Sequence, residues 1–306
     1  MSSNIIGSLI WIIFIFLSLS THLIIKSLTG EVDFIVTLFS RFAFSLPILV
    51  ILAYLARKKL FLQINNWVNI LLRSCFGFVT MVMFFSSLQL IPIGLTTALA
   101  QSSAIFVTIL SPFILGEKIG IIRWAAVISG LLGVYLMIDP VSIVNNTSHL
   151  SQLGLLLAFG SAITHAGLAL ILRKIGKTEH PESTALIHNL ITSIIITFII
   201  IFFGTKFYGT SGNFGTEILM TPNFSLATLI LLGILGSFVQ YLMAQSYKYA
   251  EATILATLRY LAIPLAAIFG FIIWDEIPTT NQIFGGVIVI SACLLITYRE
   301  MRKKKT

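Results

Sequence analysis

The sequence predicts an all-α polytopic membrane protein in which ten transmembrane helices form two inverted five-helix repeats. Of its 306 residues, 57% are hydrophobic and only 10% are charged. Soluble domains carry about 25% charged residues, so a water-soluble globular enzyme is excluded. The apolar residues also fall into ten runs of membrane-spanning length. Lipid offers no partner for a backbone N–H or C=O, so each run is expected to be helical.

The ten apolar runs follow one another with mostly short connections. Each is close to the roughly 20 residues that a helix needs to cross the hydrocarbon core. The two longest connections, 139–152 and 204–224, are rich in Gly, Ser, Thr and Asn and are too short for a soluble domain. The first run has no cleavage signature behind it and is expected to remain as a span. The runs are 5–25, 33–54, 67–88, 93–114, 122–138, 153–172, 184–203, 225–247, 252–273 and 282–298.

Lysine and arginine are concentrated on one side of the predicted bundle. If the N-terminus is cytoplasmic, fourteen of them fall in cytoplasmic connections or the C-terminal tail, against Lys26 and Lys206 on the other side. Because Lys and Arg favour the cytoplasmic side, both termini are expected there. The formal charge of +8 is then a topology signal, and it indicates no nucleic-acid partner.

The order of the spans predicts an internal repeat. Residues 1–138 and 153–298 hold five spans each, and five is odd, so the second half enters the membrane inverted. Thr21-His22 in the first span has a counterpart in Thr164-His165 in the sixth. Inverted repeats are typical of secondary transporters, whose halves open alternately to either side. The remaining segments are an external linker at 139–152 and a basic cytoplasmic tail at 299–306.

Three arginines inside the spans point to a binding site, because placing a charge in lipid is costly. Arg41 lies roughly 12 Å deep at about 1.5 Å per residue, and no Asp or Glu lies mid-span. We hypothesise that a substrate carboxylate or phosphate supplies the missing anion. Two alternatives stay open: Arg41 clamps backbone carbonyls, and Arg73 and Arg259 extend to the cytoplasmic interface.

Polar stripes at helical spacing extend this candidate site. The third span reads Arg73, Gly77, Thr80, Phe84, and the fourth begins its stripe with Thr97 and Gln101. Such stripes also suit helix packing, which leaves the long Gln and Tyr side chains and the aromatic ones as the stronger candidates. The predicted substrate-binding residues are Trp11, His22, Arg41, Phe84, Gln101, Gln240, Tyr241, Thr257, Arg259 and Tyr260.

Single residues are candidates for coupling transport to protons and for bending a helix. Histidine titrates near neutral pH, so His22 and His165 are candidates for proton coupling, and hydrogen-bonded core residues are the alternative interpretation. The lack of a mid-span carboxylate favours exchange or facilitated movement instead. Pro264, in the middle of the ninth run, is the best candidate for a kink or hinge, and a static kink is the alternative.

Other function classes find no support in the sequence. It contains no GxxxxGK[ST], HExxH or GxSxG motif, so ATP hydrolysis and intramembrane enzymology are not indicated. A channel fits an inverted repeat less well than a carrier does. Cys75 and Cys293 lie in apolar runs and are predicted to be small buried residues, not a disulfide. No cofactor or metal is indicated, and the expected partners are a small-molecule substrate and the bilayer, with the protein a monomer or homodimer.

Several short stretches, taken in order, carry a family resemblance. They are Ser40-Arg41-Phe42, Leu115-Gly116-Glu117-Lys118, Arg259-Tyr260 with Pro264, Asp275-Glu276 and Gly285-Gly286. With the five-plus-five layout, they make the chain resemble the EamA-type ten-helix members of the drug/metabolite transporter superfamily over nearly its whole length. The resemblance implies a central cavity that moves a small metabolite across a bacterial inner membrane.

The resemblance also suggests a substrate. Residues 252–299 are similar to members described as S-adenosylmethionine uptake transporters, and to others that carry riboflavin or amino acids. S-adenosylmethionine or a related carboxylate-bearing metabolite is therefore the first expectation. Import or export of amino acids, riboflavin or nucleotide-like compounds is the alternative, and an intramembrane enzyme is a remote one.

Overall fold

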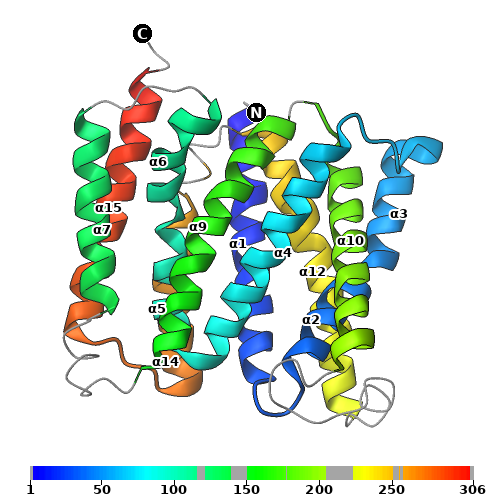
Figure 1. The fold of residues 1–306 in the computed structure, drawn as a ribbon, viewed down its shortest axis with the longest axis horizontal. Helices are drawn as coiled ribbons and strands as arrows, with labels where there is room; N and C mark the ends of the chain where they lie inside the picture. The colour runs from blue at the N-terminus through cyan, green and yellow to red at the C-terminus, as the bar shows by residue number, and fades with distance from the viewer. Residues whose placement is uncertain are drawn as a thin grey trace.

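A computed structural model describes residues 3–115, 121–138, 150–176, 178–204, 223–250, 255 and 258–303. All regular structure in these ranges is helical, which confirms the predicted class. The helices stand side by side, and the first residues of α1 and the last of α15 lie at the same end, the top of Figure 1. We call this the upper end of the bundle and the other the lower end.

The described helices account for the ten predicted spans. Six apolar segments are long enough to cross a bilayer, and four shorter ones lie at Ile93–Val107, Val127–Ile138, Ala262–Trp274 and Thr280–Ala292. In chain order the helices are α1 (Ser3–Ser27), α2 (Phe34–Ala43), α3 (Leu46–Arg57), η1 (Lys58–Leu60), α4 (Trp67–Leu90), α5 (Ile93–Gln101), α6 (Ser103–Leu115), α7 (Ile121–Ile138), α9 (Gln152–Ile175), α10 (Pro181–Phe203), α12 (Asn223–Tyr249), α14 (Ala262–Trp274) and α15 (Thr280–Lys303).

The two halves of the chain run in opposite directions and interlock. α1 runs from the upper to the lower end, and α9, which opens the second half, runs from the lower to the upper end (Figure 1). The most extensive helix pairs each join one half to the other: α7 packs along α15, α4 along α9 and α1 along α12. Apolar burial between the halves therefore holds the bundle together.

Three of the predicted spans, the second, fourth and ninth, are broken into shorter helices. α2 ends and α3 begins around Ser45, whose hydroxyl donates to Phe42 O at 2.5 Å. α5 and α6 meet at Ser102, whose hydroxyl donates to Leu99 O at 2.6 Å. Hydroxyl groups thus satisfy carbonyls that the interrupted helices leave without an N–H partner.

The ninth span is broken upstream of the residue expected to kink it. The chain turns at Tyr260 and Leu261, and α14 begins at Ala262. Pro264 lies in the first turn of α14, where its missing N–H costs no helical hydrogen bond. The prediction of a kink in mid-helix at Pro264 was therefore wrong in position, although a break does lie nearby.

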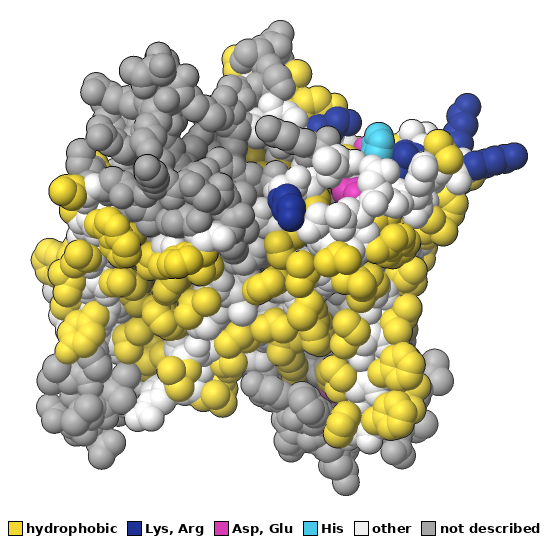
Figure 2. Space-filling model, turned by 45° about the horizontal axis from the view of Figure 1, so that its top comes forward, with side chains coloured by type: hydrophobic (Ala, Val, Ile, Leu, Met, Phe, Trp, Pro, Cys, Tyr) yellow, Lys and Arg dark blue, Asp and Glu magenta, His cyan; other side chains and the backbone are white. Residues whose placement is uncertain are grey.

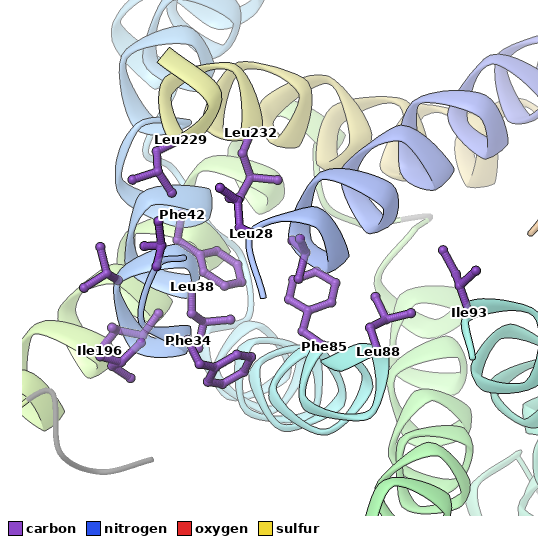
Figure 3. Packing of buried hydrophobic residues seen from close by; sticks show 14 of the residues in the cluster. Leu28, Phe34, Leu38, Phe42, Phe85, Leu88, Ile93, Ile196, Leu229 and Leu232 are labelled. Atoms are coloured by element: carbon purple, nitrogen blue, oxygen red, sulfur yellow. The ribbon is translucent and has the colours of Figure 1, made fainter. Parts of the chain in front are cut away.

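A hydrophobic cluster fills the lower half of the bundle between the two repeats (Figure 3). It joins Leu28 at the end of α1 with Leu38 and Phe42 of α2, Phe85 of α4 and Leu232 of α12, all buried. We call it the lower cluster. Because it joins helices of both halves, it closes the space between them toward the lower end.

The outer surface is apolar over a wide belt, as lipid contact requires (Figure 2). Phe198 and Phe202 of α10 are more than half exposed and stack with ring centroids 6.2 Å apart. Cys75 is exposed on this surface, which corrects the expectation that it is buried. Exposed lysines such as Lys174 and Lys248 lie at the ends of α9 and α12 near the upper end.

Candidate functional site

A central cavity lies where the two halves meet, and helices of both halves line it. Its walls come from α1, α2, α4 and α5 of the first half and from α9, α10, α12 and the middle of the ninth span, at Arg259 and Ala262, in the second. The cavity has a volume of about 120 Å³. The cavity is enclosed by apolar side chains with a few convergent polar groups, as is usual for small-molecule sites.

Six of the ten predicted binding residues line this cavity. Trp11, Tyr241 and Tyr260 are described but do not line it. Trp11 stacks on Phe14 at 4.4 Å between ring centroids, and Tyr260 is buried in an apolar cluster. The hydroxyl of Tyr241 accepts a bond from Gln245 Nε2 at 3.0 Å. Thr257 lies outside the described residues. The lining members are His22, Arg41, Phe84, Gln101, Gln240 and Arg259.

Arg41 reaches the cavity from the last turn of α2, just before the break at Ser45. Its side chain is 1% exposed, and its Nε and Nη1 have no hydrogen-bond partner in the described part of the chain. The partial negative charge of a helix C-terminus favours a cation in this position. Gly236 of α12 lies so close that a Cβ there would overlap the Arg41 guanidinium, so the α12 backbone fixes where this guanidinium lies.

Arg73 reaches the cavity from α4 and is also 1% exposed. Its Nη1 donates to Thr184 O at 2.8 Å, while its Nε and Nη2 have no partner among the described residues. The alternative in which Arg73 extends to the interface was therefore wrong. The His188 ring of α10 packs edge-on against Phe42, the neighbour of Arg41, and lines the same cavity.

Arg259 lies at the break in the ninth span, opposite the break in the fourth. Its Nη1 is 3.4 Å from His165 Nδ1, and its carbonyl accepts a bond from Gln101 Nε2 at 3.5 Å. Gln101 is the last residue of α5, so the two broken helices meet at the cavity. Discontinuous helices with exposed ends are a common way to build a site at mid-membrane depth.

Aromatic and neutral polar groups complete the walls. The rings of His22 and Phe84 are 4.7 Å apart between centroids, and Ser18 Oγ is 3.3 Å from His22 Nε2. Gln240 is 1% exposed, and its Oε1 has no partner among the described residues. The site therefore offers flat rings beside an unused hydrogen-bond acceptor.

Several lining residues were not among the predicted binding residues, although one stripe pointed to them. Arg73, Gly77, Thr80 and Phe84 of the third-span stripe all face the cavity. The helical phase of α1 gave no comparable signal, because its apolar residues occur on all sides. The missed lining residues include Phe14, Ser18, Thr21, Arg73, Thr80, Met81, His165 and His188.

A polar network closes the bundle at the lower end. Lys26 Nζ lies 2.5 Å from Glu276 Oε1 and donates to Ile91 O at 3.0 Å. The backbone N–H of Ile93 donates to Glu276 Oε2 at 2.9 Å, and Lys26 lies 5.4 Å from the ring centroid of Trp274. We call this the Lys26–Glu276 latch. It ties α1, the start of α5 and the end of α14 together beneath the lower cluster.

A second polar network joins loops at the upper end. Glu179 accepts from the backbone N–H groups of Asn65 and Asn66, at 2.9 Å for Asn66. Glu182 accepts from Gln245 Nε2 at 2.6 Å. α10 begins at Pro181, three residues earlier than the predicted span, and this places Glu182 in its buried first turn. Among the described residues, no three His, Cys, Asp or Glu side chains lie close enough to hold a metal ion.

The amino-acid sequence of this chain is similar to those of known transporters. The model of the EamA-like transporter family matches residues 5–139 and again 152–298. The S-adenosylmethionine uptake transporter of Rickettsia prowazekii is 28% identical over 267 residues, covering 86% of this chain and 83% of that protein. The riboflavin transporter of Vibrio cholerae is 25% identical over 269 residues, with the same coverage of 86% and 83%.

One further relative and one solved structure are also similar to this chain. The pseudopaline exporter of Pseudomonas aeruginosa is 24% identical over 228 residues and covers 74% of each chain. A solved structure described only as the crystal structure of a protein has a TM-score of 0.65 at 17% identity, over 98% of this chain and 99% of that one. That likeness concerns the fold alone.

Proposed function

The chain belongs to the EamA-like transporter family, and on that basis we propose that it carries a small carboxylate-bearing metabolite through its central cavity by exchange. Members of this family are secondary transporters and not enzymes, and the chain is a multi-pass membrane protein. The substrate and the mode of coupling are the parts of this statement that we propose.

The observation that carries the proposal is the set of guanidinium groups at the cavity. Arg41 and Arg73 are almost fully buried, with N–H groups that no described residue accepts. A buried donor without a partner costs free energy, more so when it is charged. A carboxylate in the cavity would accept these bonds in the geometry that guanidinium groups favour.

The geometry also supports alternating access. The lower cluster and the Lys26–Glu276 latch close one end, while the breaks in the fourth and ninth spans meet beside the cavity. Rocking of one half against the other around these breaks would open the lower end while the bound substrate stays near mid-bilayer. Without substrate the guanidinium groups lack a counter-charge, which favours movement of the loaded protein and hence exchange.

S-adenosylmethionine is the first compound to test, because several relatives are named as its uptake transporters. It bears a carboxylate, a sulfonium and an adenine ring, for which the cavity offers guanidinium groups and aromatic rings. Amino acids, riboflavin and nucleotide-like compounds are the alternatives. We propose that the protein lies in a bacterial inner membrane as a monomer or homodimer, with both termini cytoplasmic, and the exposed lysines at the upper end support that orientation.

The test is counterflow into proteoliposomes. Vesicles preloaded with each compound of a metabolite panel take up the same compound in labelled form, and uptake is expected to saturate and to depend on the preload. Arg41→Ala and Arg259→Ala are expected to abolish it, while Lys248→Ala, at an exposed site, leaves it intact. A protonophore is expected to have no effect. Full uptake by both arginine variants would remove the proposal.

A further inference from the structure

We infer that the central cavity selects substrates of net negative charge that carry two anionic groups, either two carboxylates or a carboxylate and a phosphate. This inference rests on the proposed function and narrows its substrate class. The carrying observation is an imbalance of charge. Three guanidinium groups, from Arg41, Arg73 and Arg259, line the cavity, and no Asp or Glu appears among its described lining residues.

Three acidic groups of the neighbouring helices, Glu276, Glu179 and Glu182, are engaged at the two ends of the bundle. Glu276 pairs with Lys26 at the lower end. At the upper end, Glu179 accepts from backbone N–H groups and Glu182 accepts from Gln245. Each of these carboxylates is thus held by other partners, away from the lining. The described protein groups leave the positive charge of the cavity for a ligand to balance.

The lining histidines do not neutralise the three cations, because an imidazole is neutral or cationic and adds no negative charge. Contacts with α10 hold two of the cations at one side. The Phe42 ring lies under the Arg41 guanidinium and packs edge-on against His188, and Arg73 bonds to Thr184 O, one helical turn before His188. Arg259 instead lies against His165 of α9. We call these two groups the two poles of the cavity, the first with Arg41 and Arg73 and the second with Arg259.

Two poles call for two anionic groups. Arg41 and Arg73 each have two nitrogens without a partner in the described structure, enough for one carboxylate or phosphate to bind between them. Arg259 offers a second point of attachment beside Gln101 and His165. A monoanion occupies one pole and leaves the other uncompensated in a low-dielectric site, which is costly.

Packing holds the first pole in place before a ligand arrives. A Cβ at Gly236 would overlap the Arg41 guanidinium, and a Cβ at Gly77 would lie 2.7 Å from His188 Cε1. The two glycines let α12 and α4 approach these side chains closely. Cations fixed in position discriminate by charge more sharply than flexible ones, because they cannot turn away from an unsuitable solute.

The positive charge of the cavity favours other substrates than the one that several relatives are named for. S-adenosylmethionine carries one carboxylate against an ammonium and a sulfonium, so its net charge is positive. Three uncompensated guanidinium groups disfavour such a solute. A matched four-carbon series separates charge from size: succinate is a dianion, butyrate a monoanion and putrescine a dication. Phosphoenolpyruvate then represents the carboxylate with a phosphate.

The experiment measures thermal stabilisation of the purified protein by each compound at one fixed chloride concentration, followed by counterflow in proteoliposomes. Succinate or phosphoenolpyruvate is expected to raise the melting temperature and to exchange, whereas butyrate, putrescine and S-adenosylmethionine do so weakly. Comparison of succinate with phosphoenolpyruvate decides which anion pair the site takes. Arg41→Gln and Arg259→Gln are expected to weaken dianion binding by about 10- to 100-fold each.

Control variants keep the test interpretable. Arg41→Lys retains the charge and is used if Arg41→Gln fails to fold, and it is expected to lose less affinity than Arg41→Gln. Lys174→Gln removes an exposed charge at the end of α9 and is expected to change nothing. Exchange of S-adenosylmethionine or butyrate, which each carry one carboxylate, without any response to the dianions would overturn the inference while leaving the proposed function standing. Exchange of putrescine alone would overturn both. If no compound of any charge exchanges, the proposed function falls, and the inference falls with it.

Discussion

Glu276→Gln is expected to open the cavity toward the lower end of the bundle. Glutamine keeps the shape of the side chain and one oxygen acceptor for the Ile93 N–H, so the substitution removes mainly the charge. In the closed state Lys26 then lies opposite a neutral amide, with its side chain only 12% exposed. In the open state water hydrates the ammonium, so the substitution weakens the closed state selectively.

The size of the effect follows from the contacts of the latch. Removing one partner of a buried ion pair costs about 3–5 kcal/mol. Lys26 keeps its bond to Ile91 O at 3.0 Å, and the pair is not fully buried, since 16% of the Glu276 side chain is exposed. We therefore take about 2 kcal/mol, the value of one charged hydrogen bond. This corresponds to a shift of roughly 30-fold in the ratio of closed to open protein.

Cysteine labelling measures this ratio. In a Cys75→Ser, Cys293→Ser background, Thr97→Cys places one thiol in the cavity lining. A membrane-impermeant maleimide, applied to intact cells and to inverted vesicles, reports from which side the thiol is reached. Glu276→Gln is expected to raise the labelling rate from the lower side by up to about 30-fold.

A neutral pair supplies the control. Lys26→Met with Glu276→Gln removes both charges, so no ammonium is left without its partner in the closed state, and labelling is expected to return toward the rate of the unaltered latch. An unchanged rate in Glu276→Gln, with the fold intact, would refute the reasoning that the latch holds the lower end closed. Equally fast labelling of the double variant and the single variant would show that the unpaired ammonium is not the cause.

Three further predictions concern single contacts. Gly236→Ala places a methyl group against the Arg41 guanidinium and is expected to lower substrate affinity at least about 10-fold with folding retained. Gly286→Ala is the matched control, because a Cβ at Gly286 meets nothing within 4 Å. Equal substrate affinities of the two variants would contradict the prediction. Gln240→Leu removes a buried amide whose Oε1 has no partner among the described residues, so the melting temperature is expected to hold or rise while exchange falls; loss of both together would indicate a structural role. Gln245→Leu leaves the buried Glu182 without its 2.6 Å donor and is expected to destabilise the protein by about 1–3 kcal/mol. Calorimetry in detergent should show a smaller loss in a Glu182→Gln background, and equal losses would argue against the contact.

The hydropathy pattern of a span does not show which of its aromatic residues line the cavity. Phe84 and Trp11 are both aromatic residues in apolar runs, yet Phe84 lines the cavity, while Trp11 stacks on Phe14 and packs edge-on against Tyr247. In a membrane span both the lipid face and the packed face are apolar, so the usual amphipathic pattern is lost. The third-span stripe was readable because Arg73 and Thr80 are polar on one face of α4 only.

The positions of the helix breaks are also hard to predict from the sequence. The break after α5 has no proline, since Ser102 ends the helix with its own hydroxyl bond to Leu99 O. In the ninth span Pro264 signals a disturbance, but the turn lies at Tyr260 and Leu261. Where a helix ends inside a bundle depends on which neighbours can satisfy its free carbonyls and N–H groups, and those neighbours come from distant parts of the chain.

The all-helical class, the ten spans and the three arginines within them could be read from the order of residues, because lipid imposes length and hydropathy on every segment separately. Which polar groups meet depends on the packing of the helices. This packing brings Arg41, Arg73 and Arg259 to one cavity, and it pairs Lys26 with Glu276 across most of the chain. Such pairings depend on how the two halves pack against each other, and a single span carries no record of its neighbours.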